Sequence, residues 1–256
     1  MARWEPGVRH VGSILEVAYD RDIKYPAAAI AYYTFVSLVP ILMLGFAGFG
    51  RRFAAGVEGT TTRYLTPAAQ ELFLEALVSV SGRAGGVILS VAILVWTGAN
   101  VAIGFGTAID RIEGVVDEPN LDRARRGVVV LGSLVTAGGV VSLSVLVTAI
   151  VDGGIVAGLV GPAVLLVALT VVFVPLYYAP SRVVDTPRAA LPGAVVAATG
   201  WTALHLVVQL YVGLAPRYAI YGALSGIVIL LTSLYAATML LLLGAIVNWS
   251  YSLNRA

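Results

Sequence analysis

Long uncharged stretches, separated by short charged segments, dominate the pattern along this chain. Six stretches contain no Asp, Glu, Lys or Arg, and they cover residues 25–50, 84–109, 127–151, 153–181, 189–216 and 218–254. A helix needs about 20 apolar residues to cross the roughly 30 Å hydrocarbon core of a bilayer. The pattern therefore predicts six transmembrane helices, at 26–49, 85–109, 127–150, 156–179, 190–214 and 220–246.

The apolar stretches do not alternate with polar positions, and this decides between helices and a membrane β-barrel. Barrel strands alternate with a period of two over about 10 residues. Residues 164–169 instead read Val-Leu-Leu-Val-Ala-Leu, without a polar position. We therefore expect an all-α, polytopic membrane protein that forms a single domain over residues 1–256.

Two further segments have the pattern of amphipathic surface helices. Residues 8–23 place apolar side chains at three- and four-residue spacing, as in a helix that lies along a membrane surface. Residues 65–80 do the same, and Thr66-Pro67 is a suitable cap and first turn. We expect the first helix on the inner surface and the second on the outer surface.

Composition supports a membrane protein. Of the 256 residues, 59% are hydrophobic and 12% are charged, and the mean hydropathy is +0.92, whereas soluble domains are about 25% charged. A soluble protein of this size does not bury so much apolar surface. The chain has no Cys, which excludes disulfides and thiolate sites, and its net charge of +2 does not indicate a nucleic-acid partner.

The distribution of Lys and Arg predicts the orientation. Loops that face the cytoplasm carry an excess of basic residues. With the N-terminus inside, segments 1–24, 110–126, 182–188 and 255–256 are cytoplasmic, and they hold most of the 16 basic residues. We therefore expect a multi-pass protein of the plasma or inner membrane, with both termini in the cytoplasm.

Several motifs resemble those of the YihY/BrkB family of integral membrane proteins, which carries an old ribonuclease BN-like label. The first apolar stretch contains Ala-Ala-Ala-Ile-Ala-Tyr-Tyr and Ser-Leu-Val-Pro, ending at Pro40. Later motifs are Leu-Pro-Gly-Ala at 191–194, the pair Tyr218 and Tyr221-Gly222, Leu-Leu-Gly-Ala at 242–245, and Asn248. The motifs occur in the family's order along the whole chain. The family's usual Glu after Gly-Ala is Ile246 here.

The resemblance implies a six-helix membrane protein with both ends in the cytoplasm. It leaves activity open, because the family also carries a virulence-factor label, and a role in moving or handling lipids has been considered for some of its members.

Catalytic chemistry has little support in the residue pattern. Hydrolysis of a phosphodiester needs carboxylate-held metals or an acid–base pair. The two His residues, His10 and His205, lie in different segments. Charged residues gather in the expected cytoplasmic loop 110–126, which we interpret as a solvated, self-neutralising segment or a docking site: Asp110, Arg111, Glu113, Arg123, Arg125 and Arg126. We expect no catalytic centre, metal or cofactor, and hence no enzyme.

The predicted spans lack charged residues in their central parts, which disfavours ion-coupled transport and ion channels. Uncharged polar residues remain there. On the fifth span Trp201, His205 and Gln209 recur every four residues and so share one face. They form either an interhelical hydrogen-bond seam or part of a polar substrate path. The path would comprise Tyr33, Ser37, Asn100, Trp201, His205, Gln209, Tyr221 and Ser225.

Two prolines fall inside predicted spans. Each removes one backbone hydrogen bond, so we expect Pro40 and Pro175 to kink or break their helices. Broken helices at membrane depth occur at the binding sites of transporters.

Together these patterns favour a protein that translocates a lipid or another amphipathic substrate without ion-coupling carboxylates. Membrane lipids are the expected partners, and self-association into a homo-oligomer is a further option. The alternative is a scaffold that docks a partner through residues 110–126, and a membrane-associated ribonuclease ranks last.

Overall fold

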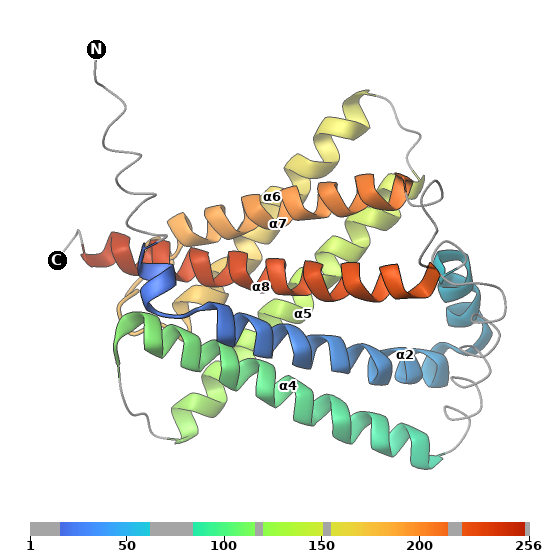
Figure 1. Ribbon diagram of the computed structural model, residues 1–256, viewed down its shortest axis with the longest axis horizontal. Helices are drawn as coiled ribbons and strands as arrows, with labels where there is room; N and C mark the ends of the chain where they lie inside the picture. Colours follow the sequence, from blue (N-terminus) through green and yellow to red (C-terminus); the bar gives the residue numbers. More distant parts are fainter. Residues whose placement is uncertain (1–15, 62–83, 116–119, 151–154, 215–221, 254–256) are drawn as a thin grey trace. The chain divides into compact units, whose positions relative to one another are not determined.

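Six long helices make up most of the computed structural model, which describes residues 16–61, 84–115, 120–150, 155–214 and 222–253 (Figure 1). The helices are α2 (Lys24–Thr61), α4 (Ala84–Glu113), α5 (Asn120–Ile150), α6 (Ile155–Tyr178), α7 (Leu191–Leu214) and α8 (Gly222–Leu253). The described part contains no strand. Each helix includes a segment long and apolar enough to cross a membrane, which confirms the predicted all-α class.

Several helices extend beyond the predicted spans. Helix α2 continues past Arg51 and Arg52, and α8 ends at Leu253 rather than near 246. In α2 a charge marks where the apolar stretch ends, but the helical backbone continues past it. In α8 no charge lies between residue 246 and the end of the helix, so there the predicted span was simply shorter than the uncharged stretch.

The expected charged loop over 110–126 is corrected by these boundaries. Helix α4 includes Asp110, Arg111 and Glu113, and α5 begins at Asn120, so that Arg123, Arg125 and Arg126 lie on its first turns. Residues 114–119 connect the two helices. Gly114 ends α4 with φ +73°, and the N–H of Val115 donates to the Asp110 carbonyl at 3.0 Å, as in a glycine-capped helix end.

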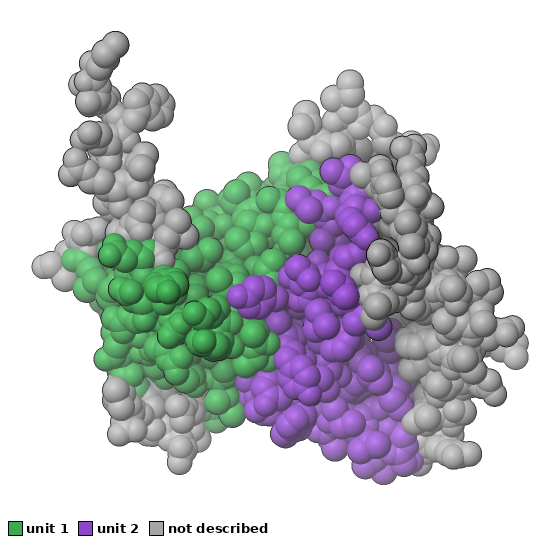
Figure 2. All heavy atoms as spheres, viewed as in Figure 1, with its two compact units in different colours: residues 1–29, 102–206, 236–256 green, residues 30–101, 207–235 purple. Residues whose placement is uncertain are grey.

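The chain divides into two compact units (Figure 2). Unit 1 comprises residues 1–29, 102–206 and 236–256, and unit 2 comprises residues 30–101 and 207–235. Both units draw on segments that are distant in the sequence, so they are not successive domains. Within unit 1, α5 and α6 pack against each other.

In unit 2, α2 and α4 run antiparallel. The rings of Tyr33 and Trp96 are in contact, and further along the pair the Ser90 hydroxyl lies 3.5 Å from the Met43 sulfur. The residue number rises along one helix as it falls along the other, and Figure 1 shows the two helices side by side.

In unit 1, α6, α7 and α8 are joined by buried and half-buried polar contacts. The Tyr177 hydroxyl donates to the Leu241 carbonyl at 2.8 Å, and the Trp201 indole N–H donates to the Ala237 carbonyl at 2.8 Å. The Trp201 ring also meets the Phe173 ring edge-on, with centroids 5.3 Å apart. Trp201 thus belongs to an interhelical seam rather than to an open path.

Neither helix is broken at its proline, and the expected kinks stay a prediction. Helix α2 continues through Pro40 and α6 continues through Pro175. Of the two amphipathic surface helices, residues 16–20 of the first are helical. The second, 65–80, lies outside the described residues.

Candidate functional site

A group of aromatic and polar side chains lies where α2 and α4 meet in unit 2; we call it the α2–α4 cluster, and it comprises Tyr32, Tyr33, Trp96 and Asn100. The Tyr33 ring meets the Trp96 ring edge-on, with centroids 5.5 Å apart and planes at 86°. Tyr32 contacts Tyr33 at 5.5 Å and 67°. Edge-to-face geometry is favourable for aromatic rings, so the cluster has a defined arrangement.

Asn100 joins the cluster from one turn further along α4. Its side-chain Nδ2 donates to the Trp96 carbonyl oxygen at 2.7 Å. This bond uses one amide hydrogen and leaves the other hydrogen and the side-chain oxygen available. Asn100 therefore adds both donor and acceptor capacity one turn along α4 from Trp96.

The depth of the cluster is unusual for Tyr and Trp. Tyr32 follows Lys24 by eight residues, which is about 12 Å at a helical rise of about 1.5 Å per residue. Trp96 precedes Asp110 by fourteen residues, or about 21 Å. In a core about 30 Å thick these residues lie well inside the hydrocarbon, whereas Tyr and Trp are enriched at the two interfaces.

The cluster is open to its surroundings. Tyr32 is 57% exposed and Trp96 is 54% exposed, and Tyr33 is half-buried. Among the described residues, the phenol groups of Tyr32 and Tyr33 and the Trp96 indole N–H have no hydrogen-bond partner. A polar group left unpaired in hydrocarbon costs several kcal/mol. The cluster therefore suits a partner that brings hydrogen-bond acceptors to membrane depth.

Ser37, which was predicted as part of the same path, uses its hydroxyl hydrogen within its own helix. It is buried and donates to the Thr34 carbonyl at 2.6 Å. Thr34 donates to Ile30, and Ser90 and Thr97 donate in the same way to carbonyls one turn back. Because each of these hydroxyls donates its hydrogen to a carbonyl of its own helix, it has no hydrogen left for a substrate.

The three polar residues predicted to share one face of α7 differ in their surroundings. Trp201 is tied into the seam with α6 and α8, His205 is half-buried, and Gln209 is exposed. Trp201 and His205 belong to unit 1, whereas Gln209, Tyr33, Ser37 and Asn100 belong to unit 2. Tyr221 lies outside the described residues, as does the side chain of Ser225. Of the predicted path residues, Tyr33 contacts the Trp96 ring, and Asn100 donates to the Trp96 backbone carbonyl one turn back in α4.

Trp96 was missed by the sequence interpretation, and Tyr32, although a polar residue of the first span, was not among the predicted path residues. One signal was available, because a Trp and an Asn four residues apart near the middle of an apolar span form a polar face. The contact with α2 is tertiary and leaves no mark in the local pattern.

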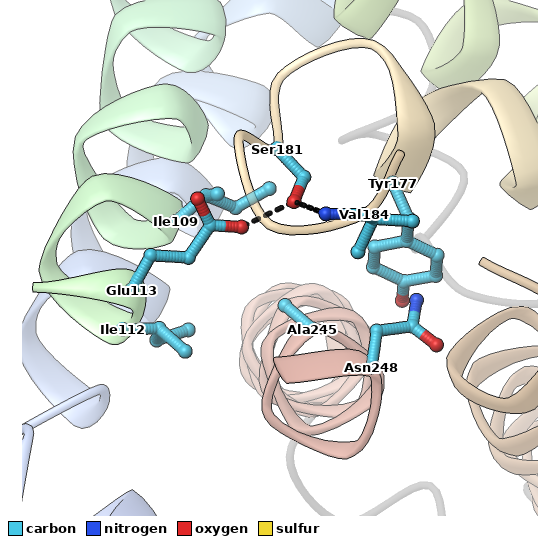
Figure 3. A pocket seen from close by; sticks show the side chains of 8 residues that line it. All are labelled: Ile109, Ile112, Glu113, Tyr177, Ser181, Val184, Ala245 and Asn248. Atoms are coloured by element: carbon cyan, nitrogen blue, oxygen red, sulfur yellow. Dashed lines mark hydrogen bonds between the residues drawn. The ribbon is translucent and has the colours of Figure 1, made fainter. Parts of the chain in front are cut away.

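A second site in unit 1 surrounds Glu113 at the end of α4 (Figure 3). Its carboxylate accepts hydrogen bonds from the Ser181 hydroxyl and from the Arg182 backbone N–H, the latter at 2.9 Å. Ser181 in turn accepts the N–H groups of Val183 and Val184 at 3.2 and 3.0 Å. Glu113 therefore holds the connection between α6 and α7.

Figure 3 shows Glu113 and Ser181 on one side of a small pocket, opposite Tyr177 and Asn248. Its volume of about 10 Å³ is close to the smallest space that holds one water molecule. This pocket cannot accept a lipid headgroup.

The other charged residues at this end also serve the fold. Arg126 donates to the Pro180 carbonyl at 3.2 Å. Arg21 donates to the Arg111 carbonyl at 2.7 Å, and its guanidinium lies 5.6 Å from the Trp249 ring centre. Arg111 and Arg125 are exposed, and the side chain of Arg123 lies outside the described residues. In the described part of the chain no three His, Asp or Glu residues are grouped as metal ligands would be.

Comparison with known proteins gives one family. The family model described as "Virulence factor BrkB" matches residues 14–256. A Bacillus subtilis (strain 168) protein named "Putative ribonuclease-like protein YfkH" is 33% identical over 90 residues, which are 35% of this chain and 31% of that protein. The chain thus aligns with about a third of that relative's length. No solved structure matches.

Proposed function

The chain belongs to the BrkB family of membrane proteins, and on this premise we propose that it translocates a lipid or another amphipathic molecule across the bilayer. The supporting observation is the α2–α4 cluster, which places exposed hydrogen-bond donors deep inside a span. A headgroup that crosses the hydrocarbon core must exchange its water for other partners. Tyr32, Tyr33, Trp96 and Asn100 offer such partners.

The exposure of the cluster fits an amphipathic substrate. Because Tyr32 and Trp96 are more than half exposed, a headgroup can contact them while its acyl chains stay in the surrounding lipid. An enclosed cavity of lipid size is then unnecessary. The phosphate and ester oxygens of a phospholipid are acceptors that match the phenol, indole and amide donors.

The mode of movement follows from the absence of charge. The described side chains of unit 2 include no Asp, Glu, Lys or Arg. Ion-coupled transporters usually place such groups inside the membrane. We therefore propose passive movement in both directions, at a cell membrane, with both termini in the cytoplasm.

Purified protein in liposomes tests this proposal. A fluorescent phospholipid in the inner leaflet becomes accessible to a membrane-impermeant quencher only when it crosses the bilayer. We expect faster crossing than in protein-free vesicles. The double substitution His205→Leu with Gln209→Leu measures what the α7 stripe contributes. A rate equal to that of empty vesicles would reject translocation for the lipid used.

The scaffold alternative has less support from the described residues. Glu113 and Arg126, two of the charges assigned to docking, bind the chain's own connection between α6 and α7. If the segment 110–126 docks a cytoplasmic partner, deletion of 115–122 should abolish capture of that partner, while the translocation rate stays unchanged.

The ribonuclease alternative comes from the name of the Bacillus relative. Its best candidate acids are Asp110 and Glu113, and Glu113 already accepts two hydrogen bonds from the chain. RNA cleavage that survives purification and disappears in Asp110→Ala with Glu113→Ala would favour the ribonuclease over translocation.

A further inference from the structure

A second group of charged and aromatic side chains lies in unit 1, where the N-terminal helical residues 16–20 give way to α2. The Lys24 ammonium sits over two rings, 5.4 Å from the Tyr19 centroid and 5.1 Å from that of Tyr25. It also lies 3.1 Å from an Asp22 carboxylate oxygen. Tyr19 is 77% exposed and Tyr25 is 64% exposed, so a molecule outside the protein can reach the group.

The backbone holds these side chains in a fixed turn. The N–H of Ile23 donates to the Ala18 carbonyl at 3.4 Å and that of Asp22 to the Tyr19 carbonyl at 3.1 Å, the two bonds of a Schellman motif. Asp22 takes the left-handed position with φ +50°. Ile23, only 2% exposed, anchors the turn in the core.

The turn lies at the level where the first span begins. Residues before Lys24 are rich in charge and those after it are apolar up to Arg51. Tyr residues beside Lys are typical of the membrane–water interface. The group is therefore at the depth of lipid headgroups.

The charges here complement a zwitterion. Lys24 can pair with a phosphate, while Asp22 and the faces of Tyr19 and Tyr25 attract a cation. The Lys24 ammonium lies over both rings and beside Asp22, so a headgroup ammonium takes this position when Lys24 turns to pair with the phosphate. Glu16 and Asp20 are also exposed, and Arg21 keeps its charge while it donates to the Arg111 carbonyl. Among residues 16–24 the acids still outnumber the bases, which disfavours lipids with a net negative charge.

We infer that Asp22, Lys24, Tyr19 and Tyr25 form a binding site for the headgroup of a zwitterionic phospholipid, with the phosphate on Lys24 and the ammonium on Asp22 and the rings. Tyr25 and Tyr32 are seven residues apart, so they fall on the same face of α2, the first at the interface and the second in the α2–α4 cluster. That this headgroup is also the transported one rests on the proposed function; the binding itself does not.

Native mass spectrometry of the full chain tests the site. The protein is released from micelles that contain equal amounts of phosphatidylethanolamine and phosphatidylglycerol, and the ratio of the two bound lipids is read from one spectrum. We expect phosphatidylethanolamine to be retained in excess. Asp22→Asn should lower that ratio about two- to fivefold, the size expected for one exposed charge contact. Asn keeps the turn because it tolerates a positive φ.

Further variants separate the roles of the groups. Lys24→Gln should reduce retention of both lipids, because it removes the phosphate partner, and Tyr25→Leu should reduce phosphatidylethanolamine more than phosphatidylglycerol. Asp185→Asn, at an exposed acid in the connection between α6 and α7, should change neither. A wild-type ratio near one, or a ratio unaffected by Asp22→Asn, would overturn the inference. Because the ratio needs no transport, its failure and that of lipid translocation are separate results.

Discussion

The side chain of Asn248 on α8 caps the first turn of α7 through Gly193: its Oδ1 accepts the Gly193 N–H at 2.7 Å, and its Nδ2 donates to the Ala190 carbonyl at 3.2 Å. Asn248 is 1% exposed. The first N–H groups of a helix lack partners within that helix. A side chain from another helix supplies one here, so the bond fixes both the start of α7 and its packing on α8.

Asn248→Leu should lower the free energy of unfolding by about 1–3 kcal/mol, because it leaves a buried N–H without an acceptor. The midpoint of unfolding in mixed detergent–SDS micelles measures the change. Ser252→Ala is the matched control, since that hydroxyl donates only to the Asn248 carbonyl one turn back. Equal midpoints for Asn248→Leu and wild type would show that the cap does not stabilise the fold.

The contact between Gly193 and Gly244 should be equally sensitive. A Cβ at Gly193 would overlap the Gly244 carbonyl oxygen, so α7 and α8 would have to separate. Overpacking of this kind costs about 1–3 kcal/mol or more. We expect Gly193→Ala to unfold at lower SDS than wild type. Gly138→Ala on α5, where a Cβ meets nothing within 4 Å, should be neutral or slightly stabilising. The reverse order of the two variants would contradict the observed packing.

Glu113 should control the order of the connection between α6 and α7. Glu113→Ala removes the acceptor of the Arg182 N–H and the partner of Ser181. We expect amide hydrogen exchange at residues 181–184 to quicken by about tenfold, the effect of losing a hydrogen bond to a charged group. Glu113→Gln keeps an acceptor oxygen and should restore most of the protection. Unchanged exchange in Glu113→Ala would mean that the connection is held by other contacts.

The membrane orientation can be tested cleanly because the chain contains no Cys. We expect a single Cys at Asp185 to react with a membrane-impermeant maleimide only from the cytoplasmic side, and one at Glu71 only from the opposite side. Whole cells and inverted vesicles give the two measurements. Labelling of the Asp185 position in whole cells would reverse the proposed orientation.

The spans could be predicted because a helix that crosses a membrane excludes charged residues over about 20 consecutive positions, and such a stretch is visible in the sequence. The ends of the helices are marked less clearly in the sequence. We predicted a loop at Asp110 and Glu113, yet the α4 backbone continues through them until Gly114. Headgroups and water tolerate both helix and loop, so charge does not distinguish between them there.

The candidate site was predictable only in part, because it depends on contacts between distant segments. Tyr33 and Asn100 were identified as polar residues within spans, but their link through Trp96 joins α2 to α4 across more than 60 residues. Trp201 shows the opposite case. Its place in a polar stripe allowed either a hydrogen-bond seam or a path, and its bond to the Ala237 carbonyl fits the seam.

The most direct test of the proposed function compares transbilayer lipid movement in the wild type with that in a variant lacking most donors of the α2–α4 cluster. Tyr33→Phe, Trp96→Phe and Asn100→Leu together remove the donors that join α2 to α4 and leave only the Tyr32 hydroxyl, while each new side chain is apolar and of broadly similar size. Val95→Leu, at an exposed apolar position of α4, is the control. We expect the triple variant to slow movement about tenfold or more, as the loss of several hydrogen bonds of about 1 kcal/mol each implies. Wild-type rates in the triple variant would contradict the role of this cluster.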